Sequence, residues 1–304
     1  MRAVVLKEKG GLYFTNVPRP EPKPDEVLLH VLVCGVCTSD MGAWRNGLGK
    51  ETILGHEVVG IVVKTGCDVT GFETGERVTG SIQCGYAEYC VAKASGLLKV
   101  PDSLMDHEAI VEPFVCLLSG IERLGPALGK SAAVIGAGYM GLGLIKLLQL
   151  HGVQDITAID AQSPALDNAA GMGAVQCLHS SGTAGHEFPV VFESAGAASA
   201  LDSAGMLCTR YGTLVIVGYH PCRREIDLAI WASKALTVIN AFEYRKQKQL
   251  LYMQQALAMA AERQLPTGRL LTHVFSFEKI EDAFKAHEQK IDGYLKSYIR
   301  ITER

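Results

Sequence analysis

The feature that most constrains this sequence is an alternation of apolar strands and helical stretches that begins near residue 130. Parallel strands need long crossover connections, which are usually helices, so this alternation predicts a doubly wound parallel sheet and an α/β fold. Six strand candidates, the number typical of that fold, lie in this half of the chain. They are residues 131–135, 156–160, 175–178, 190–193, 213–217 and 236–240.

A glycine-rich loop joins the first of these strands to the first helix. Its sequence, Gly136-Ala-Gly138-Tyr139-Met140-Gly141, has the pattern G-x-G-x-x-G. At this position the first glycine allows a sharp turn, the second lets the backbone approach a pyrophosphate, and the third lets helix and strand pack closely. The N-terminus of the following helix offers free N–H groups to phosphates. The loop therefore predicts a dinucleotide-binding site.

The ends of two later strands extend this prediction. Asp160 ends the second strand 160 − 136 = 24 positions after the first glycine, close to the ~20 expected of an acid that binds the ribose hydroxyls. Its carboxylate would repel a 2′-phosphate, and Ala161 and Gln162 supply no arginine to receive one, so NAD is favoured over NADP. Gly218 follows the fifth strand, where such folds bind the nicotinamide half.

The first 120 residues show many short strands broken by turn residues, which is typical of a compact barrel-like domain. After Pro266 the pattern turns irregular again, with a strand at 272–276, a helix at 278–289 and a strand at 297–301. This tail can return to the first domain. We therefore predict a barrel-like domain of residues 1–120, completed by 267–304, and a dinucleotide-binding domain of residues 121–266.

Charge and composition exclude several classes of protein. Lys and Arg number 29 and Asp and Glu 32, so the formal charge of −3 gives no basic surface for nucleic acid or an anionic membrane. The longest uncharged apolar stretch, residues 131–145, is shorter than the ~20 residues of a spanning helix. The charged N-terminus is unlike a signal peptide, and nine scattered cysteines are unlike a disulfide framework. We expect a cytoplasmic protein.

The barrel half carries a second motif, made of metal-binding residue types. Cys34-Gly-Val-Cys37-Thr-Ser39-Asp40 is followed, 56 − 37 = 19 residues after its second cysteine, by Gly55-His56-Glu57. A catalytic zinc takes three protein ligands from Cys, His and Asp or Glu and keeps one position open. A four-cysteine structural zinc site would need a second pair of closely spaced cysteines, which is absent.

Together these motifs resemble the medium-chain, zinc-dependent dehydrogenase/reductase superfamily (alcohol dehydrogenase-like), and within it the polyol (sorbitol-like) and threonine dehydrogenases. The matching segments are residues 34–40, 55–60, 75–78, 85–89, 111–113, 136–141 and 277–284. The resemblance implies a GroES-like β-barrel catalytic domain with a Rossmann cofactor domain. It also implies zinc, NAD, a small alcohol or ketone as substrate, and a homodimer or homotetramer.

The resemblance assigns roles to individual residues of the first domain. It implies Cys37 and His56 as zinc ligands, and Glu57 as a ligand in some states that otherwise lies close to the metal within the catalytic site. Glu112 falls where this branch places a further carboxylate, bound directly or through water. Cys34 would lie outside this set, as a buried core cysteine.

Ser39 matches the hydroxyl that passes the substrate proton outward, and Asp40 matches a residue that orients the site from behind the ligands. Two departures from the family pattern follow. Gly42 stands where many relatives carry a histidine that continues the proton path. Only Thr79–Cys84 occupies the place of the lobe that holds a structural zinc in many relatives, so we expect one catalytic zinc and no structural zinc.

The activity implied is the transfer of a hydride between a secondary alcohol or polyol and NAD(H). Two alternatives stay open. One is a zinc-free reductase of the same fold acting on activated double bonds, against which the presence of Cys37, His56 and Glu112 counts. The other is a non-catalytic nucleotide-binding sensor, which the complete ligand set and Ser39 disfavour.

Overall fold

The computed structural model describes residues 1–302, and the chain divides into two compact units. One unit comprises residues 1–113 together with the segment that begins at Tyr244, and the other comprises Phe114–Glu243. The sequence predicts a dinucleotide-binding domain of residues 121–266. The observed division instead groups helix α7 (Lys246–Ala261) with the barrel unit.

The first unit is built on a mixed sheet whose strands follow the order β15-β16-β3-β5-β6-β8, with β7 paired to β3. A second sheet has the order β2-β1-β4. The strands are β1 (Arg2–Glu8), β2 (Gly11–Asn16), β3 (Glu26–Gly35), β4 (Thr52–Ile53), β5 (Val58–Thr65), β6 (Arg77–Gly80), β7 (Tyr89–Lys93), β8 (Leu97–Lys99), β15 (His273–Ser276) and β16 (Ser297–Arg300). The helices of four residues or more are α1 (Thr38–Asn46), α7, α8 (Thr267–Leu270) and α9 (Ile280–Gln289).

Strand β3 is the central element of this unit. Eight of its ten residues are buried, because it pairs with β5, β7 and β16 and is covered on both faces. Its side chains share a core with residues of the C-terminal segment, including Phe284 and Ile299. The antiparallel pairing of β16 with β3 confirms the prediction that the tail returns to the first domain.

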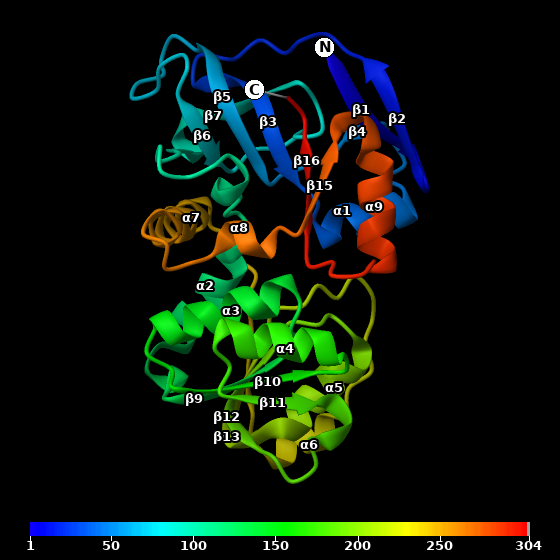
Figure 1. Ribbon diagram of the computed structural model, residues 1–304, viewed down its shortest axis with the longest axis vertical. Helices are drawn as coiled ribbons and strands as arrows, with labels where there is room; N and C mark the ends of the chain where they lie inside the picture. The colour runs from blue at the N-terminus through cyan, green and yellow to red at the C-terminus, as the bar shows by residue number, and fades with distance from the viewer. Residues whose placement is uncertain (303–304) are drawn as a thin grey trace. The chain divides into compact units, whose positions relative to one another are not determined.

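The second unit is a six-stranded sheet of order β11-β10-β9-β12-β13-β14 in which every pairing is parallel. Helices α3 and α4 pack against β9, β10 and β11, and α5 packs against β12 and β13 (Figure 1). The strands are β9 (Ser131–Ile135), β10 (Asp155–Asp160), β11 (Gln176–His179), β12 (Phe188–Glu193), β13 (Cys208–Ile216) and β14 (Thr237–Asn240). The helices are α2 (Phe114–Leu124), α3 (Tyr139–Leu150), α4 (Ser163–Met172), α5 (Ala198–Leu207) and α6 (Leu228–Ser233).

This topology confirms the predicted fold class, because six parallel strands in the order 3-2-1-4-5-6 define the doubly wound dinucleotide fold. The chain reverses direction across the sheet between β9 and β12, which are neighbours. Ligands of such sheets bind outside the carboxyl ends of the strands at this switch point. The loops after β9, β10, β12 and β13 are therefore the ones that matter for binding.

Within residues 1–302, no helix has both the length and the apolar character needed to cross a bilayer. All nine cysteines are free thiols.

Candidate metal centre and dinucleotide loop

The pairing of β3 with β5 brings the two halves of the metal motif together. Cys34 near the end of β3 is the register partner of Val58 at the start of β5, and the Gly35 amide donates to the carbonyl of Glu57 at 2.9 Å. Cys37 follows β3 and caps helix α1, while His56 immediately precedes Glu57. A separation of nineteen residues in sequence thus becomes direct proximity.

Cys37, His56 and Glu57 each offer a ligand atom, and these atoms lie within 4.8 Å of one another. Among residues 1–302 they form the only such cluster of three or more metal-binding side chains. Cys34 is not part of it: its buried thiol has a pKa raised well above the usual value by desolvation, so it stays protonated. A thiolate, an imidazole and a carboxylate are the donor types that zinc binds.

Asp40 lies behind His56 and is itself buried. Its Oδ1 atom is 3.5 Å from His56 Nδ1, and Oδ2 accepts hydrogen bonds from the Tyr86 hydroxyl at 2.8 Å and the Cys37 amide at 3.2 Å. Burial acts to raise the pKa of Asp40, but these contacts outweigh it and lower the pKa. A carboxylate that fixes the second ring nitrogen is the usual support of a metal-binding histidine.

The same contacts act on the charge of His56. Burial acts to lower its pKa, but the hydrogen bonds with Asp40 and Cys37 raise the pKa to about 12. The surroundings of this ring therefore favour a positive charge. A divalent cation bound by the imidazole would supply that charge in place of the proton, so the residues present fit a metal ion.

Glu57 is held from one side only. Lys296, buried in the same unit, donates to Glu57 Oε1 at 2.8 Å and to the carbonyl of Val36 at 2.9 Å. Within the described part of the chain, Oε2 is buried without a hydrogen-bond partner. It occupies the space beside Gly35 that a Cβ would otherwise fill. A buried carboxylate oxygen without a partner is costly, and a metal ion would satisfy it.

Glu112 and Ser39 lie outside the cluster of three. Burial raises the pKa of Glu112 to about 7, and the charges of His56 and Glu57 also act on it. Ser39 is the second residue of α1 and is half-buried. The structure records no hydrogen bond of its hydroxyl to residues 1–302, so the outward proton path from Ser39 stays a prediction.

The glycine loop has the geometry that its sequence predicts. Gly136 turns with φ +94°, and an added Cβ would lie 2.7 Å from the Ala195 amide nitrogen. A Cβ on Gly141 would overlap the carbonyl oxygen of Gly136. Gly138, the N-cap of α3, is exposed, and a Cβ there would meet nothing within 4 Å. The backbone is thus tightly packed at Gly136 and Gly141 and accessible at Gly138, which fits the approach of a pyrophosphate.

Tyr139 and Met140 form the first turn of α3, where backbone N–H groups are available to phosphates. Asp160 ends β10, and its two carboxylate oxygens accept from the amides of Ala137 at 2.7 Å and Gln162 at 2.9 Å. The aspartate therefore ties the end of its strand to the glycine loop. Its role at the ribose stays a prediction.

Comparison with known proteins places the chain among its relatives. The sequence model described as alcohol dehydrogenase GroES-like domain matches residues 23–102. Over 337 residues the chain is 28% identical to the sorbitol dehydrogenase of Ovis aries, in an alignment covering 94% of this chain and 93% of that protein. The family model and these full-length relatives support a place for the chain in the zinc-type medium-chain dehydrogenase superfamily. Because the alignment is longer than the 304 residues of this chain, the sheep enzyme carries segments absent here.

Solved structures of dehydrogenases share the fold of this chain. Galactitol-1-phosphate dehydrogenase from Escherichia coli superposes with a TM-score of 0.87 at 24% identity, covering 99% of this chain and 100% of that chain. Alcohol dehydrogenase from Thermus sp. ATN1 gives a TM-score of 0.82 at 26% identity, again covering 99% and 100%. The predicted resemblance and the GroES-like plus Rossmann architecture are both confirmed.

Sequence reasoning missed two residues that shape the candidate metal centre. Lys296 anchors Glu57 across 239 positions of sequence, and Tyr86 reaches Asp40 across 46. The signal for Lys296 was a lysine at the start of an apolar strand, between Leu295 and Ser297. Tyr86 lies in the segment 85–89, and its hydroxyl is a polar group that must find a partner when the ring is fully buried.

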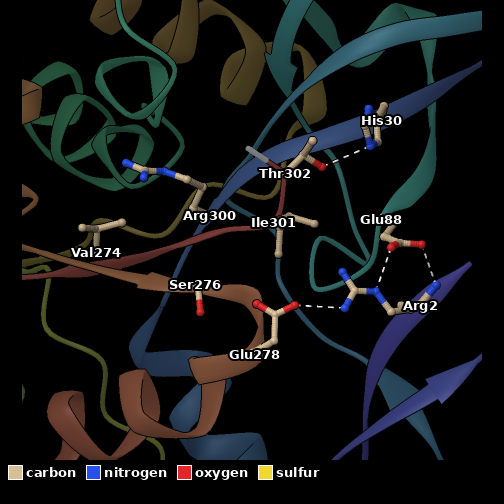
Figure 2. Close-up of a pocket in the computed structure, with 9 residues that line it drawn as sticks. All are labelled: Arg2, His30, Glu88, Val274, Ser276, Glu278, Arg300, Ile301 and Thr302. Carbon is tan, nitrogen blue, oxygen red and sulfur yellow. Dashed lines mark hydrogen bonds and ion pairs between the residues drawn. The ribbon is translucent and has the colours of Figure 1, made fainter. Parts of the chain in front are cut away.

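A separate cavity of about 640 Å³ lies in the barrel unit, and no predicted site residue lines it. Three of its charged side chains form a network: Arg2 pairs with Glu88 and Glu278, each at 2.9 Å (Figure 2). His30 is bound to the Thr302 hydroxyl at 3.1 Å. None of the side chains that line this cavity belongs to the cluster of Cys37, His56 and Glu57.

Proposed function

We propose that this protein is a zinc-dependent oxidoreductase that transfers a hydride between a secondary alcohol or polyol and NAD(H). The observation that supports it most is the convergence of Cys37, His56 and Glu57 around one point, with Asp40 set against the second nitrogen of the imidazole. The relatives of the chain include sorbitol, galactitol-1-phosphate and alcohol dehydrogenases, which supports polyols and secondary alcohols as the substrate class.

The metal ligands we propose are the Cys37 thiolate, the His56 imidazole and the Glu57 carboxylate, with Glu112 as a further carboxylate that acts directly or through water. When bound, zinc supplies Lewis acidity that lowers the pKa of a substrate hydroxyl. Asp40 would hold the His56 ring so that its other nitrogen is available to the metal ion. We propose one catalytic zinc and no structural zinc.

Ser39 is the residue we propose to accept the proton that the substrate hydroxyl loses, at its Oγ atom. Its place in the first turn of α1, two residues after Cys37, keeps it near the ligand cluster. Gly42 has no side chain to carry the proton further, so the next step outward uses water. Proton transfer at Ser39 then accompanies the departure of the hydride from the substrate carbon.

The cofactor we propose is NAD. The loop Gly136–Gly141 and the first turn of α3, with Tyr139 and Met140, take the pyrophosphate, and Asp160 takes the ribose hydroxyls. To bind the ribose, the Asp160 carboxylate adds those hydroxyls to its two backbone contacts, since each carboxylate oxygen accepts more than one hydrogen bond. Gly218, in the loop after β13, belongs to the region of the nicotinamide half.

The two alternative functions are less well supported. A zinc-free reductase needs no cluster of a thiolate, an imidazole and a carboxylate. A sensor needs no aspartate behind the histidine to orient its ring. The homo-oligomeric state and the cytoplasmic location stay predictions of the sequence. Light scattering of the purified protein tests the predicted dimer or tetramer.

The test combines metal analysis with a panel of polyols and secondary alcohols, followed by the absorbance of NADH. Cys37→Ser removes the proposed thiolate, and Cys67→Ser, at an exposed cysteine of the same unit, is the matched control. We expect one zinc per chain and alcohol-dependent NADH formation in the wild type and the control, and loss of both in Cys37→Ser. Retention of zinc and activity by Cys37→Ser would contradict the proposal, as would a zinc-loaded wild type that reduces no NAD across the panel.

A further inference from the structure

A chain of three polar side chains crosses the carboxyl edge of the parallel sheet in the second unit. Glu193, the last residue of β12, is fully buried. Its Oε2 atom lies 2.8 Å from His220 Nε2, and His220 Nδ1 accepts a hydrogen bond from Arg224 Nε at 3.1 Å. The proposed function uses none of these three residues. We call them the strap.

The strap explains how a carboxylate can be buried at this position. A buried charge is costly unless it is paired and hydrogen-bonded. Glu193 Oε1 accepts from the Gly196 amide at 2.7 Å. Because Arg224 donates to Nδ1 of His220, the ring proton lies on Nε2 and is donated to Glu193. The guanidinium of Arg224 polarises the ring, which strengthens the hydrogen bond that His220 donates to the buried carboxylate.

The strap also joins two loops. Arg224 and His220 belong to the loop after β13 (residues 217–227), and Gly196 belongs to the loop after β12 (residues 194–197). Arg224 Nη2 donates to the Gly196 carbonyl at 3.1 Å, so the loops are linked on both sides of Gly196. Gly218 has to be glycine here, because a Cβ would lie 2.5 Å from Glu193 Oε2.

The joined loops lie beside the glycine loop. A Cβ on Gly136 would lie 2.8 Å from the Cα atom of Ala195. The Ser194 hydroxyl donates a hydrogen bond to the Gly136 carbonyl oxygen at 2.8 Å. Ligands of this fold extend across the switch point between β9 and β12. Asp160, proposed for the ribose of the adenosine half, is on β10, on the opposite side of β9 from β12. The loops after β12 and β13 therefore remain for the nicotinamide half.

From this arrangement we propose that His220 and Arg224 are positioning residues for the nicotinamide half of the cofactor. They touch no reacting atom. By tying the loop after β13 to Gly196 and Glu193, they hold the backbone around Gly218 in place before the cofactor arrives. Binding then loses less free energy to the ordering of this loop. This inference rests on the proposed function and goes beyond it, because it divides the binding site into a half that depends on the strap and a half that does not.

The test compares two ligands on the full-length protein by isothermal titration calorimetry. NADH contains the nicotinamide, whereas ADP-ribose keeps the adenosine and both phosphates but lacks that ring. The variants are Arg224→Met and His220→Gln. The control is Arg223→Met, which removes the same charge from an exposed neighbour that makes no recorded hydrogen bond or ion pair with residues 1–302.

We expect both strap variants to bind NADH about tenfold more weakly, as the loss of a pre-ordered loop would cause, and to bind ADP-ribose within about twofold of the wild type. Arg223→Met should match the wild type for both ligands. Arg224→Lys should recover NADH binding only in part, because lysine keeps the charge but not the geometry of the guanidinium.

Unchanged NADH affinity in both strap variants overturns the inference. An equal loss for NADH and ADP-ribose also overturns it, since that pattern belongs to a general loss of structure. An equal loss of NADH affinity in Arg223→Met likewise overturns it, because the loss of charge, and not of the strap's hydrogen bonds, would then be responsible. Failure of the wild type to bind NADH at all contradicts the proposed function, a result distinct from the others.

Discussion

Lys296 provides the sharpest test of the metal centre. Its ammonium group is buried and donates to Glu57 Oε1 at 2.8 Å, while Glu57 is only 1% exposed. Lys296→Met keeps a similar length and volume but removes the charge. Glu57 Oε1 would then lose its contact with the ammonium group. Glu57 Oε2 already has no hydrogen-bond partner among residues 1–302, so the whole carboxylate would be buried without compensation.

The magnitude follows from the burial of the pair. Removal of one partner of a buried ion pair costs about 3–5 kcal/mol, because the other charge stays in the interior uncompensated. We expect this loss in the zinc-free protein, measured by urea unfolding. In the zinc-loaded protein the metal ion supplies a new positive partner for Glu57, so the loss should shrink to about half or less, on the order of 1–2 kcal/mol.

Two further variants separate this explanation from a simple packing defect. Lys296→Met combined with Glu57→Gln removes both charges, so it should be more stable than Lys296→Met alone. Lys279→Met, which breaks an exposed pair with Asp282, should change the free energy of unfolding by less than about 1 kcal/mol. Equal losses with and without zinc would refute the reasoning, as would a double variant less stable than the single one.

Two other predictions concern the glycine loop and the response to pH. Gly141→Ala should destabilise the protein and abolish NADH binding, because the added Cβ overlaps the Gly136 carbonyl oxygen. Gly138→Ala, whose Cβ meets nothing within 4 Å, should weaken NADH binding and leave the melting temperature unchanged. Equal melting temperatures for the two variants would contradict this prediction. Burial lowers the pKa of His287 to about 3, so the unfolded chain takes up the proton first as pH falls below about 6.5, and stability is lost. At pH 5 this loss amounts to (6.5 − 5) × 1.36, about 2 kcal/mol. The difference in unfolding free energy between wild type and His287→Asn should therefore narrow by that amount between pH 7 and pH 5, and a constant difference would show that His287 does not titrate in this way.

The fold of the second unit was predictable from sequence because the signals are local. Most of the six strands contain an apolar run of a few residues, and the loop Gly136–Gly141 lies between the first strand and helix α3. The boundaries between the two units were less predictable from the sequence. Helix α7 (Lys246–Ala261) continues directly from the second unit in sequence but groups with the first, and only tertiary contacts decide which of the two it joins.

The metal cluster was predictable for a different reason. Cys37, His56 and Glu57 were proposed from spacing and from a resemblance to a family, and the register of β3 against β5 then brings them together. The position of Glu112 relative to them could not be derived in this way. It lies on no strand, so no register relates it to the cluster, and the structure places it outside the group of three.

The residues that escaped prediction are those that compensate a buried charge from a distant part of the chain. Glu57 depends on Lys296, and Glu193 depends on His220 and Arg224, at separations of 239 and 27 positions for the direct contacts. In the sequence alone, each of these basic residues is expected to be an ordinary surface residue, because lysine and arginine are usually exposed. Only the burial of its acidic partner gives it a specific role. A buried glutamate next to a functional loop is therefore the feature to look for first, since it requires a partner, and that partner adjusts the site without touching the substrate.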